Sequence, residues 1–305
     1  MALLCEHKEI KNDRKCSFRN KLSMPKFYEV VHIGGKIMQH VLTLRKIFLI
    51  FGFALAAFGC DMNKTQLPNA NKGILVVRYS YSANGELSAK SEYEYDSNGN
   101  RTKGSDYNEN GELSLYFEIE YDSKGNPTKF SNYNGNGELS YYYECEYDSE
   151  GNETKSSEYD ANGELSYYIE SEYDSNGKKT KYSVYTVNGE LLDYCEYEYD
   201  TNGNNTKRND YNASGELFGY EELEYDINGN WTKASGYVNG EWSGYDEYEY
   251  DSNGDRTKES YYNVNGELSG YKEYEYDSNR NQTKMSVYNA NGELDSYTVY
   301  FYKSI

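Results

Sequence analysis

From about residue 79 to the end of the chain, short segments in which tyrosine alternates with polar residues are separated by turns that contain glycine. The run Glu-Tyr-Glu-Tyr at residues 92–95 is typical of these segments. A period of two places successive side chains on opposite faces of a strand, and tyrosine and threonine favour strands. The pattern therefore predicts β-strands throughout this region.

Two turn signals recur along the chain and define a repeat. An Asn-Gly-Glu-Leu mark, with two single-residue variations, has its glycine at Gly85, Gly111, Gly137, Gly163, Gly189, Gly215, Gly240, Gly266 and Gly292. The step is 26 residues except for the 25 residues from Gly215 to Gly240. A second mark, Tyr-Asp-x-x-Gly, lies between these and begins first at Tyr95; only its copy at Tyr276 has an arginine, Arg280, in place of glycine. Two turns per unit predict two strands per unit and about 18 strands in all.

Asn-Gly between alternating segments is a strong hairpin signal and predicts two-residue type I′ turns. Such turns fix the register of neighbouring strands. Tyr116 should then face Tyr133, and Lys129 should face Glu120 on one side and Glu144 on the other. The same arithmetic in most units predicts a Glu–Lys–Glu ladder beside a tyrosine ladder on one face of the sheet.

Two places depart from this register. The short unit should place Asp246 opposite Lys233, and Lys284 should meet Glu275 on one side but Val299 on the other. The opposite face of the sheet should hold the leucine of each Asn-Gly-Glu-Leu mark and the tyrosine of each Tyr-Asp mark. The leucine positions are Leu87, Leu113, Leu139, Leu165, Leu191, Leu217, Trp242, Leu268 and Leu294.

The predicted fold is all-β: an elongated, twisted or spiral antiparallel β-meander of tandem 26-residue two-strand repeats. The formal net charge of −20 and the shortage of aliphatic residues rule out a large conventional core. Stability should come from ladders and from aromatic packing shared between neighbouring units. So acidic a chain is also unsuited to a phosphate backbone, so we expect no nucleic-acid partner.

The first 60 residues differ from the repeats. Residues 1–37 are basic and aperiodic, and we interpret them as a non-native upstream extension, with Met38 as the true start. Residues 38–59 have the basic region and short apolar run of a signal peptide. Residues 60–73 would then be a polar tether, and residues 74–305 the β-repeat domain.

The residues before Cys60 resemble the lipobox of bacterial lipoproteins. Gly59 and Cys60 match that pattern, and Ala57 is tolerated in it. The resemblance implies that Cys60 is diacylated, with palmitate among the acyl groups, and anchors the chain in the cell envelope, at the outer membrane or the cell surface. An ordinary signal peptide with a chance cysteine, or an uncleaved anchor, remains the alternative.

The serial Tyr-Asp-x-x-Gly marks resemble the Rhs or YD-repeat family of bacterial surface and secreted proteins. Tyr95, Asp96, Gly99, Asn100 and their later equivalents carry the resemblance over residues 79–302. It implies a strip of β-hairpins, which in long members of the family winds into a hollow shell that can enclose a toxin. The 26-residue unit and its second turn differ from the common pattern. A MORN-like single-layer sheet is the second choice.

Few residues suited to catalysis occur in the repeats. The three histidines, His7, His32 and His40, all lie in the part that we expect to be removed, so nucleophile–histidine schemes are excluded and we expect no enzyme. Glu92 and Glu94 are paired carboxylates, but their recurrence in most units is typical of a structural element. We expect no cofactor and no metal; residues 96–100 leave weak calcium binding open, although an aspartate that hydrogen-bonds the turn explains them more simply.

One row of tyrosines is the candidate binding surface. Its members are Tyr116, Tyr142, Tyr168, Tyr194, Tyr220, Tyr245, Tyr271 and Tyr297. Exposed aromatic rows flanked by carboxylates can stack on sugar rings or contact a protein, and they can also simply cover a sheet that has no second layer. The leading hypothesis is an envelope-anchored module for surface binding or adhesion to a glycan or protein. Its rivals are a structural spacer or shell component without a ligand, and a part of a YD-repeat toxin-related system.

Overall fold

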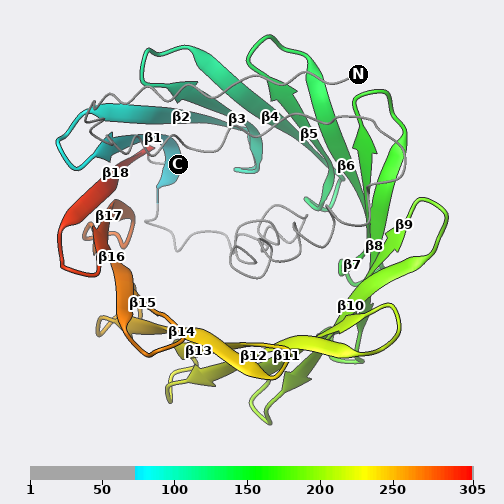
Figure 1. Cartoon of the computed structure of the whole chain (residues 1–305). Helices are drawn as coiled ribbons and strands as arrows, with labels where there is room; N and C mark the ends of the chain where they lie inside the picture. The colour runs from blue at the N-terminus through cyan, green and yellow to red at the C-terminus, as the bar shows by residue number, and fades with distance from the viewer. Residues whose placement is uncertain (1–72, 304–305) are drawn as a thin grey trace, which may run out of the picture. The chain divides into compact units, whose positions relative to one another are not determined.

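The computed structural model describes residues 73–303 and shows a single antiparallel sheet of eighteen strands (Figure 1). The strands are β1 (Ile74–Ser82), β2 (Leu87–Tyr95), β3 (Arg101–Asn108), β4 (Leu113–Tyr121), β5 (Pro127–Asn134), β6 (Leu139–Tyr147), β7 (Glu153–Asp160), β8 (Leu165–Tyr173), β9 (Lys179–Thr186), β10 (Leu191–Tyr199), β11 (Asn205–Asn212), β12 (Leu217–Tyr225), β13 (Trp231–Val238), β14 (Glu241–Tyr250), β15 (Arg256–Tyr262), β16 (Leu268–Tyr276), β17 (Gln282–Asn289) and β18 (Leu294–Lys303). The prediction of an all-β antiparallel meander with two strands per unit is confirmed. Within residues 73–303 there is no helix of the length and hydrophobicity that a membrane crossing needs.

The sheet closes on itself, so the prediction of an elongated or spiral strip is wrong. β1 pairs with β18 in antiparallel register, with Tyr81 opposite Tyr297 and Ser80 opposite Thr298 (Figure 1). Strand twist makes wide open sheets curl, and a free edge exposes unpaired backbone groups. Closure satisfies both edges, because an even number of antiparallel strands brings the last strand to the first in the correct direction.

The turns between regular strands are not the predicted type I′ turns. In the turn after β4 the Gly125 N–H donates to the Asp122 carbonyl (3.1 Å), and the Asp122 N–H donates to the Asn126 carbonyl (2.9 Å). Gly125 has a φ of 83°, whereas no residue before it in the turn has a positive φ. This is a type I turn followed by a glycine in the left-handed region, a three-residue hairpin loop. An Asn-Gly pair is compatible both with a two-residue type I′ turn and with this three-residue loop, so the pair alone does not distinguish the two turns.

The short unit does contain a type I′ turn. Asn239 and Gly240 have φ values of 52° and 80°, and Val238 pairs with Glu241 across them. The missing residue of the 25-residue step therefore falls in this loop, which shortens from three residues to two.

The predicted register is nevertheless correct in the regular units. Tyr116 pairs with Tyr133, Glu120 with Lys129, and Lys129 with Glu144. The reason is that each three-residue loop is followed by a β-bulge, and the extra loop residue and the extra strand residue offset each other. Lys284 likewise pairs with Glu275 and Val299, as predicted.

In the short unit the compensation fails, and the predicted Asp246–Lys233 pair is wrong. Lys233 pairs with Glu247, and Asp246 pairs with Ala234. The bulge is kept there although the loop has lost its third residue, so Lys233 meets Glu247 as Lys129 meets Glu144 in a regular unit. The predicted pair was therefore wrong by one position, and Asp246 lies on the face opposite to the predicted one.

The bulges also overturn the predicted place of the leucine row. Leu139 pairs with Tyr133, the cross-strand partner of the tyrosine ladder, because the bulge lies between Leu139 and the rest of its strand. Trp242, which replaces this leucine, stacks on Tyr245 with ring centroids 5.6 Å apart. The leucine row therefore lies on the tyrosine face of the sheet.

Closure gives the sheet an inner and an outer face. Side chains on the inner face of a closed sheet converge, so they are more crowded than those outside. Ile119, Phe130 and Tyr143, which are 4%, 8% and 9% exposed, form a cluster on one face. The ladder residues on the other face, such as Tyr116 and Lys129, are only half-buried. We therefore assign the cluster to the inner face and the tyrosine and Glu–Lys–Glu ladders to the outer face.

Candidate functional site: the tyrosine–lysine rows of the outer face

The aspartate of each Tyr-Asp mark organises its turn. One carboxylate oxygen of Asp122 accepts hydrogen bonds from the N–H groups of Lys124 (2.8 Å) and Asn126 (2.9 Å), and the other accepts one from the Asn126 side chain (3.0 Å). The hydrogen bond from the Asn126 backbone is the largest of the influences that hold the pKa of Asp122 below its ordinary value. Similar bonds occur at Asp96, Asp148, Asp174, Asp200, Asp226, Asp251 and Asp277. The carboxylate thus has a structural role in the turn, as the simpler interpretation of residues 96–100 proposed. Among residues 73–303, no group of three or more acidic, cysteine or histidine side chains is placed to hold a metal ion.

In seven of the eight copies, the tyrosine of the same mark ties its unit to the strands before it. The Tyr121 hydroxyl donates to the carbonyl of Arg101 at 2.6 Å, and burial raises the pKa of Tyr121 to about 12. The same bond, always to the residue 20 positions earlier, is made by Tyr95, Tyr147, Tyr173, Tyr199, Tyr225 and Tyr276. The sequence singled out this tyrosine but gave no partner for it. Because this tyrosine recurs in every unit, a regular contact with the preceding unit could have been expected from the sequence.

The eight tyrosines of the candidate binding row all stack on a second tyrosine across the strand pair. Tyr116 and Tyr133 are typical, with ring centroids 4.5 Å apart and an interplanar angle of 6°. The other pairs are Tyr81–Tyr297, Tyr142–Tyr159, Tyr168–Tyr185, Tyr194–Tyr211, Tyr220–Tyr237, Tyr245–Tyr262 and Tyr271–Tyr288. Their centroids lie 4.3–5.0 Å apart. The predicted pairing of Tyr116 with Tyr133 is thus confirmed, and the candidate row is one side of a double row of stacked rings.

A lysine covers the other face of each candidate ring. The Lys129 ammonium lies 4.1 Å from the centroid of Tyr142 and 3.4 Å from the Glu144 carboxylate. Since Tyr159 stacks on Tyr142 from the opposite neighbouring strand, the Tyr142 ring lies between an ammonium group and a second ring. The equivalent lysines are Lys103, Lys155, Lys181, Lys207, Lys233, Lys258 and Lys284, at 4.2–5.7 Å. Sequence reasoning treated the lysines and tyrosines as separate ladders and missed this cation–π contact.

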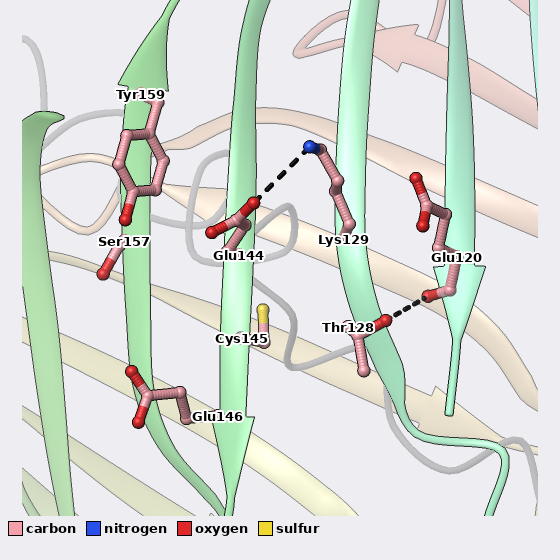
Figure 2. A pocket seen from close by; sticks show the side chains of 8 residues that line it. All are labelled: Glu120, Thr128, Lys129, Glu144, Cys145, Glu146, Ser157 and Tyr159. Carbon is pink, nitrogen blue, oxygen red and sulfur yellow. Dashed lines mark hydrogen bonds and ion pairs between the residues drawn. The ribbon is translucent and has the colours of Figure 1, made fainter. Parts of the chain in front are cut away.

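Recesses lie between these rows and are polar (Figure 2). The lining of one is Glu120, Thr128, Lys129, Glu144, Cys145, Glu146, Ser157 and Tyr159. Thr128, the extra residue of the bulge, donates its hydroxyl to the Glu120 carbonyl at 3.4 Å. A second recess, lined by the residues 26 positions earlier, repeats the arrangement. The outer face is therefore a series of like polar recesses beside stacked rings.

The sequence analysis did not predict the cluster of charged groups on the inner face. Asp246 pairs with Ala234 on this face, at the position that Tyr143 and Glu221 occupy in their units. Burial, and then repulsion from Glu259 and Glu221, raises its pKa to about 6. Glu259 accepts a hydrogen bond from the Tyr274 hydroxyl (2.6 Å) and forms an ion pair with Arg256 (3.5 Å). Arg256 and Lys272 are the counter-charges of Glu259 in this group.

Comparisons with known proteins show limited similarity. No known protein family matches the sequence, and no curated protein matches it either. Among solved structures, the TcdB2-TccC3 complex without its hypervariable C-terminal region is similar over 72% of this chain, at 13% identity and a TM-score of 0.28. This chain spans only 15% of the length of that chain. A porin-like protein from Bacteroides uniformis is similar over 76% of this chain and 99% of its own, at 12% identity and a TM-score of 0.39. A porin-like protein from Bacteroides vulgatus gives 77% and 100% coverage, 12% identity and a TM-score of 0.32.

The predicted lipidation site, Cys60, lies outside the described residues, as do the proposed signal peptide and most of the tether. The eight candidate tyrosines all lie within them and all fall on one face. The structure thus brings the candidate binding residues together into a continuous row.

Proposed function

We propose that this protein is a lipid-anchored repeat protein of the bacterial cell envelope whose outer face binds a glycan or a protein through many equal, weak contacts. The supporting observation is the repetition of one chemical unit, a tyrosine pair with a lysine above it and glutamates beside it, at eight places on one face. Equal sites on one rigid body multiply a low affinity when the ligand also repeats. The proposal assigns the protein no catalysis and no cofactor.

The covered rings restrict the chemistry of the ligand. A sugar or side chain cannot lie flat on Tyr142 without displacing Lys129 or Tyr159. The groups that remain accessible are ring edges, phenol hydroxyls, ammonium groups and carboxylates. The ligand should therefore be polar and rich in hydrogen-bonding groups, and the net charge of −20 disfavours a polyanion.

The test compares two sets of substitutions on the same face. Replacing Tyr168, Tyr194 and Tyr220 by threonine removes three adjacent rings and keeps strand propensity. We expect binding to cells or to a glycan array to fall at least tenfold, because several weak contacts are lost together. Replacing Lys181 and Lys207 by threonine is the comparison: it should lower stability and, because the rings remain, reduce binding less than the tyrosine variant does. Equal binding by the tyrosine variant and the parent protein would rule out this surface.

The anchor requires a separate test. Cys60→Ala should abolish acyl labelling and release the protein from the membrane fraction, since one cysteine carries the proposed modification. The same substitution at Cys195, which is a free thiol in the structure, is the control and should change neither property. Unchanged membrane association and labelling of the Cys60 variant would exclude lipidation at this site.

A structural spacer without a ligand is the second candidate, and one observation favours it. Both faces of each candidate ring are filled by groups of the protein itself, so the row is complete without a partner. If the tyrosine variant loses thermal stability and the parent binds nothing on arrays or cells, the spacer is the better description.

A further inference from the structure

One of the eight stacked tyrosine pairs spans the place where the sheet closes. Tyr81 on β1 and Tyr297 on β18 have ring centroids 4.9 Å apart and an interplanar angle of 18°. The two residues are 216 positions apart in the sequence. Ser80 and Thr298, beside them, share a hydrogen bond of 3.1 Å between their hydroxyl groups. The closure therefore depends on noncovalent contacts between the first and last strands.

We propose that the stacked pairs are sites of oxidative coupling, in which a one-electron oxidant joins two phenol rings as dityrosine, and that coupling of Tyr81 to Tyr297 closes the sheet covalently. Both rings are half-buried, so part of each is accessible to an oxidant in solution. Two near-parallel rings at this separation are already in van der Waals contact. Coupling then needs a small ring movement and no change of the backbone.

The chemistry balances with a peroxide as the final oxidant. Each phenol loses one electron to the oxidised haem of a peroxidase and one proton, which gives two phenoxyl radicals. A new carbon–carbon bond forms between the ring carbons next to each hydroxyl-bearing carbon. Each ring hydrogen at the new bond then moves to oxygen and restores the phenol. The pair has lost two electrons and two protons, and hydrogen peroxide has been reduced to two molecules of water.

Carboxylates of the outer face are placed to accept the phenol proton. Tyr262, stacked on Tyr245, hydrogen-bonds to Glu247, and Tyr107 hydrogen-bonds to Glu92. Loss of the electron is easier when the proton has an acceptor within hydrogen-bond distance. In most units a glutamate of the ladder lies two positions after the tyrosine of the candidate row, on the same face.

Tyr107 is an internal control for whether coupling requires two stacked rings. Tyr107 occupies the same place in its unit as Tyr133, on the same face, and is also half-buried. Its cross-strand partner is Lys90, whose ammonium lies 5.3 Å from the centroid of the Tyr107 ring. Tyr107 can therefore be oxidised but has no partner ring for coupling.

The test treats the full-length protein at low concentration with hydrogen peroxide and a haem peroxidase. Dityrosine fluorescence should appear in the monomer fraction. Tryptic mapping should find the peptide of residues 79–90 joined to the peptide of residues 285–303, with the loss of two hydrogens. Because that bond makes a loop of most of the chain, the product should also migrate faster in a denaturing gel. In the peptide of residues 104–124, which contains both Tyr107 and Tyr116, fragmentation should place every intramolecular cross-link on Tyr116 and none on Tyr107.

The matched variant is Tyr81→Phe, which keeps a ring in the stack but has no phenol to oxidise. The seam cross-link and the fast-migrating band should disappear, while cross-links such as Tyr116 to Tyr133 remain at the level of the parent. Circular dichroism of the variant should match that of the parent before oxidation. Cross-links that form only between molecules, or that involve Tyr107 as often as the stacked residues, would overturn the proposal.

Discussion

The outer and inner faces of this sheet are built from neighbouring residues of the same repeat, but away from the Tyr-Asp turns only the outer face repeats. On the outer face, the same position is lysine in eight successive units, from Lys103 to Lys284. The next residue in the chain points to the inner face, and there the repeat is lost. The inner residues are, in order, Gly104, Phe130, Ser156, Tyr182, Arg208, Ala234, Glu259 and Met285.

This difference shows which interactions define the unit. An outer lysine meets a tyrosine ring and, except at Lys284, a glutamate on each side, so its identity is fixed by neighbours in two other strands. An inner residue only needs to fit the residues opposite it. Phe130 packs against Ile119 and Tyr143, whereas Ser156 lies opposite Cys145. The repeat is thus maintained by the outer rows, and the inner face varies locally within that frame.

The largest expected effect comes from breaking the outer register. Deletion of residues 136–161 removes β6 and β7 and joins two equivalent Asn-Gly turns, so sixteen strands should still close in register. Deletion of only residues 136–148 removes one strand, puts unlike strands side by side and leaves an odd number that cannot close antiparallel. We expect β-sheet circular dichroism per residue to be kept in the first variant and largely lost in the second.

Equal loss of signal from both deletions would contradict the view that the 26-residue unit is the cooperative element. A deletion of residues 162–187, which removes β8 and β9, is the matched control. It should behave like the first deletion, because units in a repeat array contact mainly their neighbours.

The second prediction concerns the inner face. Phe130→Ser introduces the residue that the next unit has at this position, but Ile119 and Tyr143 remain shaped for a ring. We expect the free energy of unfolding to fall by about 3 kcal/mol, since a large buried ring is lost and a cavity remains. The opposite exchange, Ser156→Phe, should also destabilise the protein, because Ser156 is 3% exposed and has no room for a ring. Chemical denaturation measures both, and a change below about 1 kcal/mol in each would show that the inner face is not fitted locally.

Much of the architecture was accessible from the sequence because the outer face repeats. The strand number, the antiparallel pairing, and the register of pairs such as Tyr116–Tyr133 follow from two turn signals and a period of two. The closure was not accessible, because it depends on the accumulated twist and coil of eighteen strands. The bulges were also missed. Each bulge adds one residue to a strand and so offsets the extra residue of the loop, which leaves the predicted strand pairing unchanged.

The candidate tyrosines were located correctly, but their environment was not. Sequence spacing placed Tyr142 and Lys129 in the same face and could not say that the ammonium lies over the ring. That contact depends on the rotamers of two long side chains. The inner charged group around Asp246 was missed for a different reason, because the register of the short unit was wrong by one residue.

The third prediction compares the pH dependence of the inner face and the turns. The pKa of Asp246 is raised from 3.8 to about 6 by burial and by Glu259 and Glu221, with Lys272 acting in the opposite direction. Between about pH 4 and pH 6 the folded protein then binds a proton that the unfolded chain has released, so the free energy of unfolding falls as pH rises through this window. After allowance for partial exposure, we expect about 1–2 kcal/mol.

Asp246→Asn should remove this pH dependence, since the amide does not titrate. Asp122 is the contrasting residue, because its pKa is lowered by the turn. The ionised Asp122 carboxylate therefore stabilises the folded protein at pH values above its pKa in the unfolded chain, and this stabilisation is lost as pH falls. The Asp122→Asn variant should accordingly lose less stability at acid pH than the parent. Thermal melting of both variants between pH 3 and pH 7 measures the two slopes. Slopes of the same sign at the two positions would contradict the assigned environments.

The smallest expected effect is the removal of one outer lysine. Lys181 lies 4.4 Å from the centroid of Tyr194 and pairs with Glu172 and Glu196 in the ladder. Lys181→Thr should lower the free energy of unfolding by only about 0.5–1 kcal/mol, because each half-exposed contact is weak. The ion-pair part is screened by salt and the ring contact less so, so the difference from the parent should shrink but persist at 1 M salt, where the screening length is about 3 Å. Lys181→Met, which keeps the aliphatic stem over the ring, is the control and should recover the part of the loss that salt does not remove. A difference that vanishes completely in salt would show that Lys181 contributes only charge, and the outer row would then consist of two independent ladders.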